Sequence, residues 1–312
     1  MSPELAVPRG LWPHRFRAMG SDIHLVLPAR RASDAARAVE HLFAEWEDVL
    51  SRFRPESELS LVNAQAGTPV TVGPILLAAV EAAVEAARAT GGLFDPTLGH
   101  ELVRLGYDRS FEEIGDVPAA CARPRGGGAW RTIVVDRDGG TVTVPPDGAL
   151  DLGGIAKGMA VDASLELLGG LGIETALVSA GGDLAVLGLP PGRRAWDVLV
   201  GGDPRGPVVP LVRGALATSG SARRHWRQGN VARHHLIDPG TGEPAVSGLR
   251  EVTVAAGTCR MAEVGATVAF IAGPRLGPAL LKRLAVAALL VTTADEQIVV
   301  GRWPGRGVPH AA

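Results

Sequence analysis

Hydrophobic and polar positions along this chain form short mixed blocks, with no repeat of solenoid length. Ile23, Leu25 and Leu27 alternate with their neighbours, which is typical of a half-buried strand. Residues 33–50 carry apolar side chains at helical spacing, and Ser33 can cap the start of that helix. The chain therefore changes from strand to helix within its first fifty residues.

The later blocks continue this mixed order. Pro74 can begin an alanine-rich helix that runs to about Thr90, where two glycines end it. Residues 132–135 and 141–144 predict a hairpin. The other expected strands are 176–180, 196–200, 252–255, 287–291 and 297–300, and the other expected helices are 155–168, 260–272 and 278–284. Because strands and helices do not alternate regularly, a doubly wound sheet is disfavoured and an α+β fold is expected.

The length of 312 residues suffices for a substantial core. We expect residues 13–304 to form one domain, or two closely associated subdomains. Residues 1–12 and 305–312 are expected to be loose tails.

Composition narrows the function classes. The formal net charge is −2 and aromatic residues make up 4%, so a nucleic-acid surface is not expected. Two cysteines do not make a disulfide framework. The N-terminus shows no signal peptide and we see no apolar stretch long enough to span a membrane, which favours a cytoplasmic protein.

The segment 150–162 carries the most informative chemistry. It reads as an acid, two glycines, the pair Lys157-Gly158 and then a helical pattern. Backbone N–H groups at a helix start, with a lysine beside them, can bind phosphate oxygens. Asp151 and Asp162 bracket that turn. The glycine pattern G-x-G-x-x-G is absent, so a Rossmann dinucleotide site is not indicated.

Three further positions each allow a structural and a ligand role. Gly20 interrupts the first strand, where it can form a β-bulge or allow a ligand or another backbone segment to approach closely. Phe53 can stack on a planar ligand or pack in the core. Asp95 precedes a proline, and it can contact a ligand or shape an Asx-type turn.

Polar groups also follow the later strands. Gly181-Gly182-Asp183 can admit a phosphate or form a hairpin turn, and the hydroxyls of 218–221 can hold a phosphate or a ring edge. His234 and His235 point to opposite faces of a strand, so a shared zinc ion is disfavoured and one of them is expected as a ligand contact or proton shuttle.

Glu263 and Thr267 lie four residues apart on one helix face. Their oxygens suit Mg²⁺, although a glutamate in a first turn can also simply complement the helix dipole.

Taken in order, these segments resemble the FAD:protein FMN transferase family. The matching segments are Met19-Gly-Ser21, Ser57–Ser60 with Asn63, Phe94–Thr97, Asp151–Gly158 with Asp162, Gly181–Asp183, Thr218–Gly220, His235–Pro239 with Gly242, and Ala262–Thr267. The resemblance implies an α+β fold related to the T-fold. It also implies Mg²⁺-dependent transfer of FMN from FAD to a threonine or serine hydroxyl of an acceptor protein, with release of AMP.

The resemblance implies the site residues as well. FAD would contact Met19, Phe53, Leu93, Phe94, Asp95, Asp151, Lys157, His235 and Ile237, and Mg²⁺ would bind Glu263, Thr267 and the carbonyl of Gly154. Lys157 can neutralise charge on the breaking diphosphate. The base that takes the acceptor's proton is either His235 or Asp238.

The chain departs from the family pattern at two informative positions. Glu263 stands where an aspartate is usual, which shifts the carboxylate by roughly an ångström, and Mg²⁺ tolerates poor geometry badly. Ser21 stands in place of a threonine. Two alternatives therefore remain open: an FAD-binding protein with little catalysis, and an FAD pyrophosphatase that gives FMN and AMP.

Overall fold

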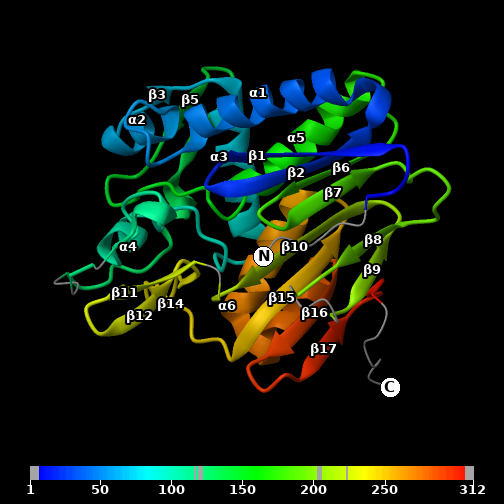
Figure 1. The fold of residues 1–312 in the computed structure, drawn as a ribbon. Coiled ribbons are helices and arrows are strands. Elements are labelled where there is room, and N and C mark those ends of the chain that lie inside the picture. The colour runs from blue at the N-terminus through cyan, green and yellow to red at the C-terminus, as the bar shows by residue number, and fades with distance from the viewer. Residues whose placement is uncertain (1–6, 116, 119–121, 202–205, 223, 306–312) are drawn as a thin grey trace.

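The computed structural model describes residues 7–115, 117–118, 122–201, 206–222 and 224–305. Its centre is an eight-stranded sheet in which all neighbouring strands run antiparallel (Figure 1). In spatial order the strands are β1 (Leu11–Ala18), β2 (Ser21–Pro28), β6 (Ala176–Ala180), β7 (Asp183–Leu187), β10 (Gly214–Gly220), β15 (Leu249–Ala256), β16 (Ala287–Thr292) and β17 (Gln297–Val300). With the helices below, this sheet confirms the expected α+β class.

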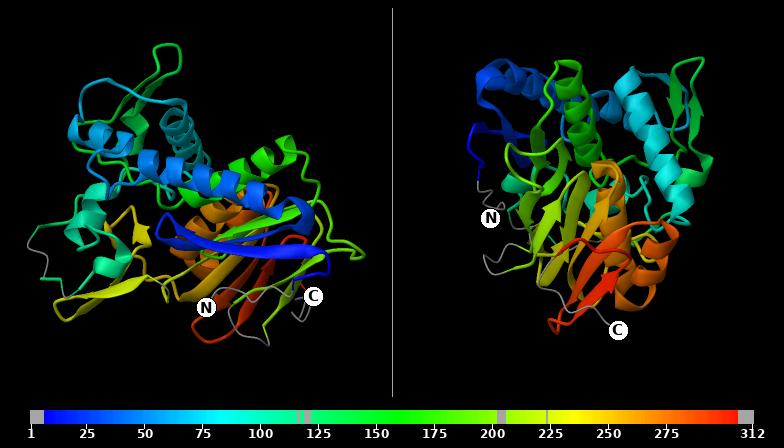
Figure 2. Two further views of the ribbon diagram at one scale, coloured as in Figure 1. Left: turned by 45° about the horizontal axis from the view of Figure 1, so that its top comes forward. Right: turned by 90° about the vertical axis from the view of Figure 1, so that its right-hand side faces the viewer.

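Three helices cover one face of this sheet: α1 (Ala32–Leu50), α5 (Ala156–Gly170) and α6 (Cys259–Arg283) (Figure 2). Buried side chains such as Leu25, Phe43 and Phe270 fill the space between. The hairpin of β8 (Trp196–Leu199) and β9 (Val208–Leu211) covers the opposite face, where Trp303 also packs.

A second group of elements lies beside the end of the sheet. It contains α2 (Glu58–Ala64), α3 (Pro74–Ala89) and a small sheet of β3 (Val70–Thr71), β5 (Thr141–Thr143) and β4 (Val134–Asp136). Met19 and Trp46 pack against the hydrophobic core of this group and also against the core under the main sheet. The two hydrophobic cores are therefore continuous.

A third group forms the outer wall of this end of the molecule (Figure 1). It contains α4 (Gly99–Arg104), the hairpin of β11 (His225–Gln228) and β12 (Val231–His234), and the hairpin of β13 (Ile237–Asp238) and β14 (Glu243–Pro244). Short 3₁₀ turns are η1 (Ala29–Arg31), η2 (Phe111–Glu113) and η3 (Ala129–Thr132).

Helix α6 joins the two helices expected at 260–272 and 278–284, with a break at Gly273, where φ is 73°. By length and mean hydropathy α6 could cross a membrane, which the sequence analysis did not anticipate. Half of its most apolar window is buried in the protein, and it packs on β10, β15 and α5. We therefore interpret α6 as a core helix.

Some local expectations were wrong. Strand β6 pairs with β7, which periodicity missed because Asp183–Leu187 is almost wholly buried and shows no alternation. Helix α1 starts at Ala32 directly from η1, so Ser33 lies inside the first turn and caps nothing. The N-terminal tail is shorter than expected, because β1 already begins at Leu11.

Gly20 lies in a turn and not inside a strand. Ala18 pairs with Ser21, and Met19 and Gly20 form the two-residue connection between β1 and β2 with φ values of 51° and 59°. Positive φ at both positions is what a tight hairpin of this kind requires. The turn presents Met19 to the pocket described below.

Candidate active site

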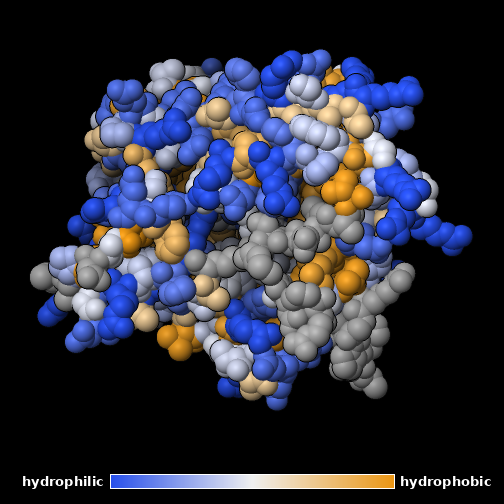
Figure 3. Space-filling model, viewed as in Figure 1, coloured by the Kyte–Doolittle hydropathy of each residue, from blue (hydrophilic) through white to orange (hydrophobic). Residues whose placement is uncertain are grey.

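One pocket brings the predicted residues together. It has a volume of about 670 Å³. Its walls come from the β1–β2 turn, the segment after α1, the start of α5, the β6–β7 turn, the end of β10 and one face of α6. Of the predicted site residues, Met19, Phe53, Leu93, Phe94, Asp95, Asp151, Gly154, Lys157, His235, Ile237, Glu263 and Thr267 line it. The face in Figure 3 is mostly polar, with a hollow left of centre.

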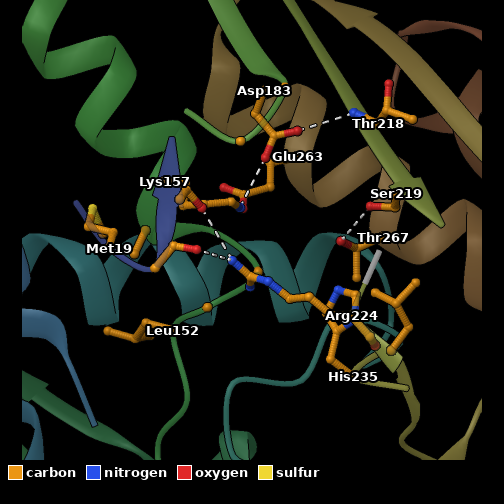
Figure 4. A pocket seen from close by; sticks show the side chains of 18 of the residues that line it. Met19, Leu152, Lys157, Asp183, Thr218, Ser219, Arg224, His235, Glu263 and Thr267 are labelled. Atoms are coloured by element: carbon orange, nitrogen blue, oxygen red, sulfur yellow. Dashed lines mark hydrogen bonds and ion pairs between the residues drawn. The ribbon is translucent and has the colours of Figure 1, made fainter. Parts of the chain in front are cut away.

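Lys157 is the charged centre of this pocket (Figure 4). Its Nζ lies 3.0 Å from Oδ2 of Asp183 and also pairs with Oε1 of Glu263. Burial opposes the charge on Lys157, but the two carboxylates outweigh it and raise the pKa of the ammonium. Burial, together with the nearby Asp183, raises the pKa of Glu263 despite Lys157. One ammonium thus serves two carboxylates, and this part of the pocket keeps a net negative charge.

The close approach of α5 and α6 explains how these groups meet. Gly158 contacts the first turn of α6 so closely that a Cβ there would lie 2.8 Å from backbone atoms of Cys259 and Arg260. The Gly158 N–H donates to Oε2 of Glu263 at 2.8 Å. The glycine after Lys157 therefore lets α6 bring its glutamate to the lysine.

Hydroxyl groups extend the oxygen-rich side of the pocket. Asp183 Oδ1 accepts the N–H of Thr218 at 3.2 Å, and Ser219 Oγ lies 3.3 Å from Thr267 Oγ1. These are hard oxygen donors around a point that already attracts a cation, and Mg²⁺ is often held by one or two carboxylates plus substrate phosphates. The donor set therefore fits Mg²⁺. Asp183, which we had linked only to a glycine turn, belongs to it.

Asp162 does not bracket this turn as expected. Its Oδ1 accepts the N–H of Cys259 at 2.7 Å, and its Oδ2 accepts the N–H of Arg260 at 3.0 Å. It therefore satisfies orphan donors at the start of α6 and does not line the pocket.

Arginine and aromatic side chains form a second wall. Arg52 donates from Nε to Oδ2 of Asp151 at 2.5 Å, and its guanidinium lies 4.2 Å from the centre of the Phe53 ring and 4.7 Å from that of Tyr107. Its Nη2 is buried and has no hydrogen-bond partner in the part of the chain that the structure describes. No motif pointed to Arg52 or Tyr107, because their roles depend on contacts between the segment after α1 and the segment after α4.

The two candidate bases differ in position. His235 lines the pocket, and burial together with the charge of Arg224 lowers its pKa to about 3. Asp238 does not line the pocket, and its Oδ1 accepts the N–H of Gly240 at 2.9 Å in a local turn. The neighbouring His234 instead contacts the Phe270 ring edge-on, so the two histidines do point apart.

Asp95 forms the Asx-type turn that was one of its two readings. Its Oδ1 accepts the N–H of Thr97 at 2.8 Å, and its Oδ2 accepts the N–H of Gly128 at 2.5 Å. The carboxylate lines the pocket, and both of its oxygens accept hydrogen bonds from the backbone. Asp95 therefore holds the pocket wall in shape and also faces the pocket.

Comparisons with known proteins show which family this chain resembles. The family model described as "ApbE family" matches residues 19–290. The FAD:protein FMN transferase of Treponema pallidum (strain Nichols) is 32% identical over 304 residues, which cover 88% of this chain and 82% of the relative. That of Vibrio cholerae serotype O1 is 29% identical over 268 residues, 83% of this chain and 79% of the relative.

Solved structures show the same fold. The ApbE protein of Thermotoga maritima superimposes with a TM-score of 0.83 at 27% identity, covering 93% of this chain and 97% of that one. A histidine-to-glycine variant of the flavin transferase ApbE from Vibrio cholerae gives 0.81 at 25% identity over the same shares. Fold and pocket therefore define a class of α+β proteins with a charged pocket beside an antiparallel sheet. Within that class, the chain belongs to the ApbE family.

Proposed function

We propose that this protein transfers the FMN half of FAD to a threonine or serine hydroxyl of an acceptor protein and releases AMP. The relatives named FAD:protein FMN transferase support the transferase activity. The observation that carries the assignment to this chain is the convergence of Lys157, Asp183 and Glu263 in one pocket with an aromatic wall.

The reaction is a phosphoryl-group transfer. The acceptor oxygen attacks the phosphorus of the FMN half, a new P–O bond forms, and the bond from that phosphorus to the bridging oxygen breaks. AMP leaves with the bridging oxygen and its electron pair, and the hydroxyl proton goes to a base. Negative charge grows on the phosphate oxygens, and a positive group held nearby lowers the barrier. Lys157 is such a group.

Glu263, Thr267 and the Gly154 carbonyl, with Asp183 beside them, would hold Mg²⁺, which when bound neutralises charge on the diphosphate. The chain's own residues prepare this place. Gly158 fixes one oxygen of Glu263, and Thr218 fixes one oxygen of Asp183. Because each carboxylate is oriented before a ligand arrives, less freedom is lost on binding.

Within this proposal His235 takes the proton. It lines the pocket, whereas Asp238 is engaged in a turn outside it. The imidazole is neutral at ordinary pH, because its pKa is lowered to about 3, so it keeps a free lone pair but is a weak base in the pocket without ligand. An anionic diphosphate beside it would favour the protonated form and raise that pKa.

The direct test is incubation with FAD, MgCl₂ and a candidate acceptor protein, followed by intact-mass measurement. We expect an FMN-sized addition on the acceptor and an equal amount of AMP. AMP release without an acceptor would indicate a pyrophosphatase instead. Bound FAD with no AMP release would indicate a binding protein.

Variants of the charged centre sharpen this test. Lys157→Ala and Glu263→Ala should each abolish the mass addition. Lys282→Ala is the matched control, because Lys282 is the chain's other lysine and lies exposed near the end of α6. Full transfer by both charged-centre variants would reject this site.

A further inference from the structure

In the described part of the chain, the cationic side chains lining the pocket are paired with carboxylates, with one exception. The lining cations are Arg52, Arg54, Lys157, Arg224 and Arg250. Arg52 pairs with Asp151, Arg54 with Glu47 and Asp48, Lys157 with Asp183 and Glu263, and Arg250 with Asp295. Among the residues that the structure describes, no carboxylate lies within 4.0 Å of the Arg224 guanidinium.

The contacts of Arg224 are weak ones. Its Nη2 donates to the hydroxyl of Ser21 at 3.3 Å and to the carbonyl of Gly20 at 3.5 Å, both at the long end of hydrogen-bond distances. Arg224 lies between β10 and β11, and its side chain reaches to the β1–β2 turn (Figure 4). Most of the donors of this guanidinium are therefore available to a ligand.

Arg224 also lies near the groups that carry the proposed chemistry. Its backbone carbonyl is 3.4 Å from Nδ1 of His235. Its charge acts on both His235 and Lys157, lowering the pKa of the first and opposing the rise at the second. Lys157 is already compensated by Asp183 and Glu263, whereas Arg224 has no carboxylate partner among the described residues, so the charge of Arg224 remains available to an anion that enters the pocket.

We propose that Arg224 binds the diphosphate of the dinucleotide substrate. A guanidinium presents a planar fork that matches two phosphate oxygens, and such charge-assisted bonds are stronger than neutral ones. The inference rests on the proposed function for the identity of the dinucleotide. It adds a binding residue that no sequence motif indicated.

The test separates phosphate recognition from general damage to the pocket. Calorimetric titration with ADP and, separately, with riboflavin is carried out on the unaltered protein and on Arg224→Gln and Arg224→Lys. We expect Arg224→Gln to weaken ADP binding at least about tenfold, as loss of a hydrogen bond to a charged group does. Riboflavin, which has no phosphate, should bind within about twofold of the unaltered protein. The ADP affinity of Arg224→Lys should lie between those of the unaltered protein and Arg224→Gln, since lysine keeps the charge but lacks the planar pair of donors.

The matched control is Arg227→Gln. Arg227 lies three residues further on in β11, is exposed and does not line the pocket, so ADP binding should not change. Thermal melting of each variant checks that it is folded, and the long bonds of Arg224 predict little change in melting temperature.

Three outcomes would overturn the inference. Unchanged ADP affinity in Arg224→Gln would show that the arginine does not bind phosphate. Equal losses for ADP and riboflavin would show a structural role at the β1–β2 turn, and no ADP binding by the unaltered protein would also contradict it. The unaltered protein could also fail to transfer FMN while Arg224→Gln still loses affinity for ADP and not for riboflavin. That result would contradict the proposed function and support this inference.

Discussion

A single lysine lies between two buried carboxylates in this protein. The side chains of Lys157, Asp183 and Glu263 are 14%, 8% and 4% exposed. Removing one partner of a buried ion pair leaves a charge with no compensation, which commonly costs about 3–5 kcal/mol. Lys157→Met should therefore lower the free energy of unfolding by about 3 kcal/mol, and MgCl₂ should restore part of it. Urea unfolding with and without MgCl₂ measures both effects.

The matched double variant tests the cause. Lys157→Met/Glu263→Gln removes one charge of each sign, so it should be more stable than Lys157→Met alone. A single variant as stable as the unaltered protein would show that the two carboxylates do not repel each other in this pocket.

His235 gives a pH dependence whose direction follows from its pKa. The native pKa is lowered from 6.5 to about 3, so between these values the unfolded chain binds a proton that the native protein does not. Stability from this group is therefore lost as the pH falls from about 6.5 towards 3, by up to about 1.4 kcal/mol per pH unit. Urea unfolding at pH 5 and pH 7 should show a smaller loss in His235→Gln.

The exposed His100 on α4 provides the comparison. His100→Gln should leave the difference between pH 5 and pH 7 as it is in the unaltered protein. Equal pH dependence in the His235 and His100 variants would mean that His235 is not held neutral by the fold.

Site residues could be predicted from the sequence where they lie within a recognisable motif. Lys157, Glu263 and His235 were singled out, and the structure places all three in one pocket. Arg52 and Arg224 were not, because an isolated arginine in a polar segment is most often solvated. Only the folded chain shows that Arg52 is buried and that Arg224 lines the pocket with no carboxylate partner among the described residues.

At the scale of elements, the close packing of α5 on α6 positions the charged centre. A methyl group at Gly158 would meet the α6 backbone at 2.8 Å, and a backbone cannot move aside as a flexible side chain can. Gly158→Ala should therefore destabilise the protein by about 1–3 kcal/mol, as overpacking does. Thermal or urea unfolding measures this.

Gly169 is the control within the same helix. Nothing lies within 4 Å of a Cβ built there, so Gly169→Ala should be neutral or stabilising by up to about 1 kcal/mol, as alanine favours a helix interior. If both variants lost the same stability, the cause would be the backbone of α5 and not its contact with α6.

The elements also show where local patterns were sufficient. The helix after Pro74 begins at that proline and ends at Ala89, because proline suits the first helical position and two glycines follow. Strand β7 was missed because burial on both faces removes the alternation that marks a strand.

At the scale of the molecule, a buried network ties the outer wall together. Arg104 of α4 pairs with Glu101 at 2.6 Å and with Glu243 of β14 at 2.9 Å, and it donates to the carbonyl of Gly242 at 2.7 Å. Gln228 of β11 in turn donates to the Arg104 carbonyl at 2.9 Å. One arginine thus joins three elements of the outer wall, of which α4 contributes Leu102 to the pocket.

Arg104→Met should loosen this wall. The Arg104 side chain is 9% exposed, and its loss leaves Glu101 buried without its cation, so we expect a cost of about 3–5 kcal/mol. Hydrogen exchange should rise in α4 and β11 more than in the main sheet. The exposed pair of Arg109 with Asp108 is the control, and Arg109→Met should change stability by no more than about 0.5 kcal/mol. Uniform exchange across the molecule would contradict a local role.

The sequence by itself determined local pieces of this protein: the turn that ends in Lys157 and Gly158, the main helices, and strands such as β2, β6, β15, β16 and β17, although it did not predict β7, β9 or β10. These follow from backbone preferences and side-chain periodicity, which act over a few residues. Only the tertiary structure decided the strand order, the use of Asp162 at the start of α6, and the meeting of Lys157 with Glu263, which are 106 positions apart. Such contacts depend on how distant elements pack, and no short pattern in the chain encodes that.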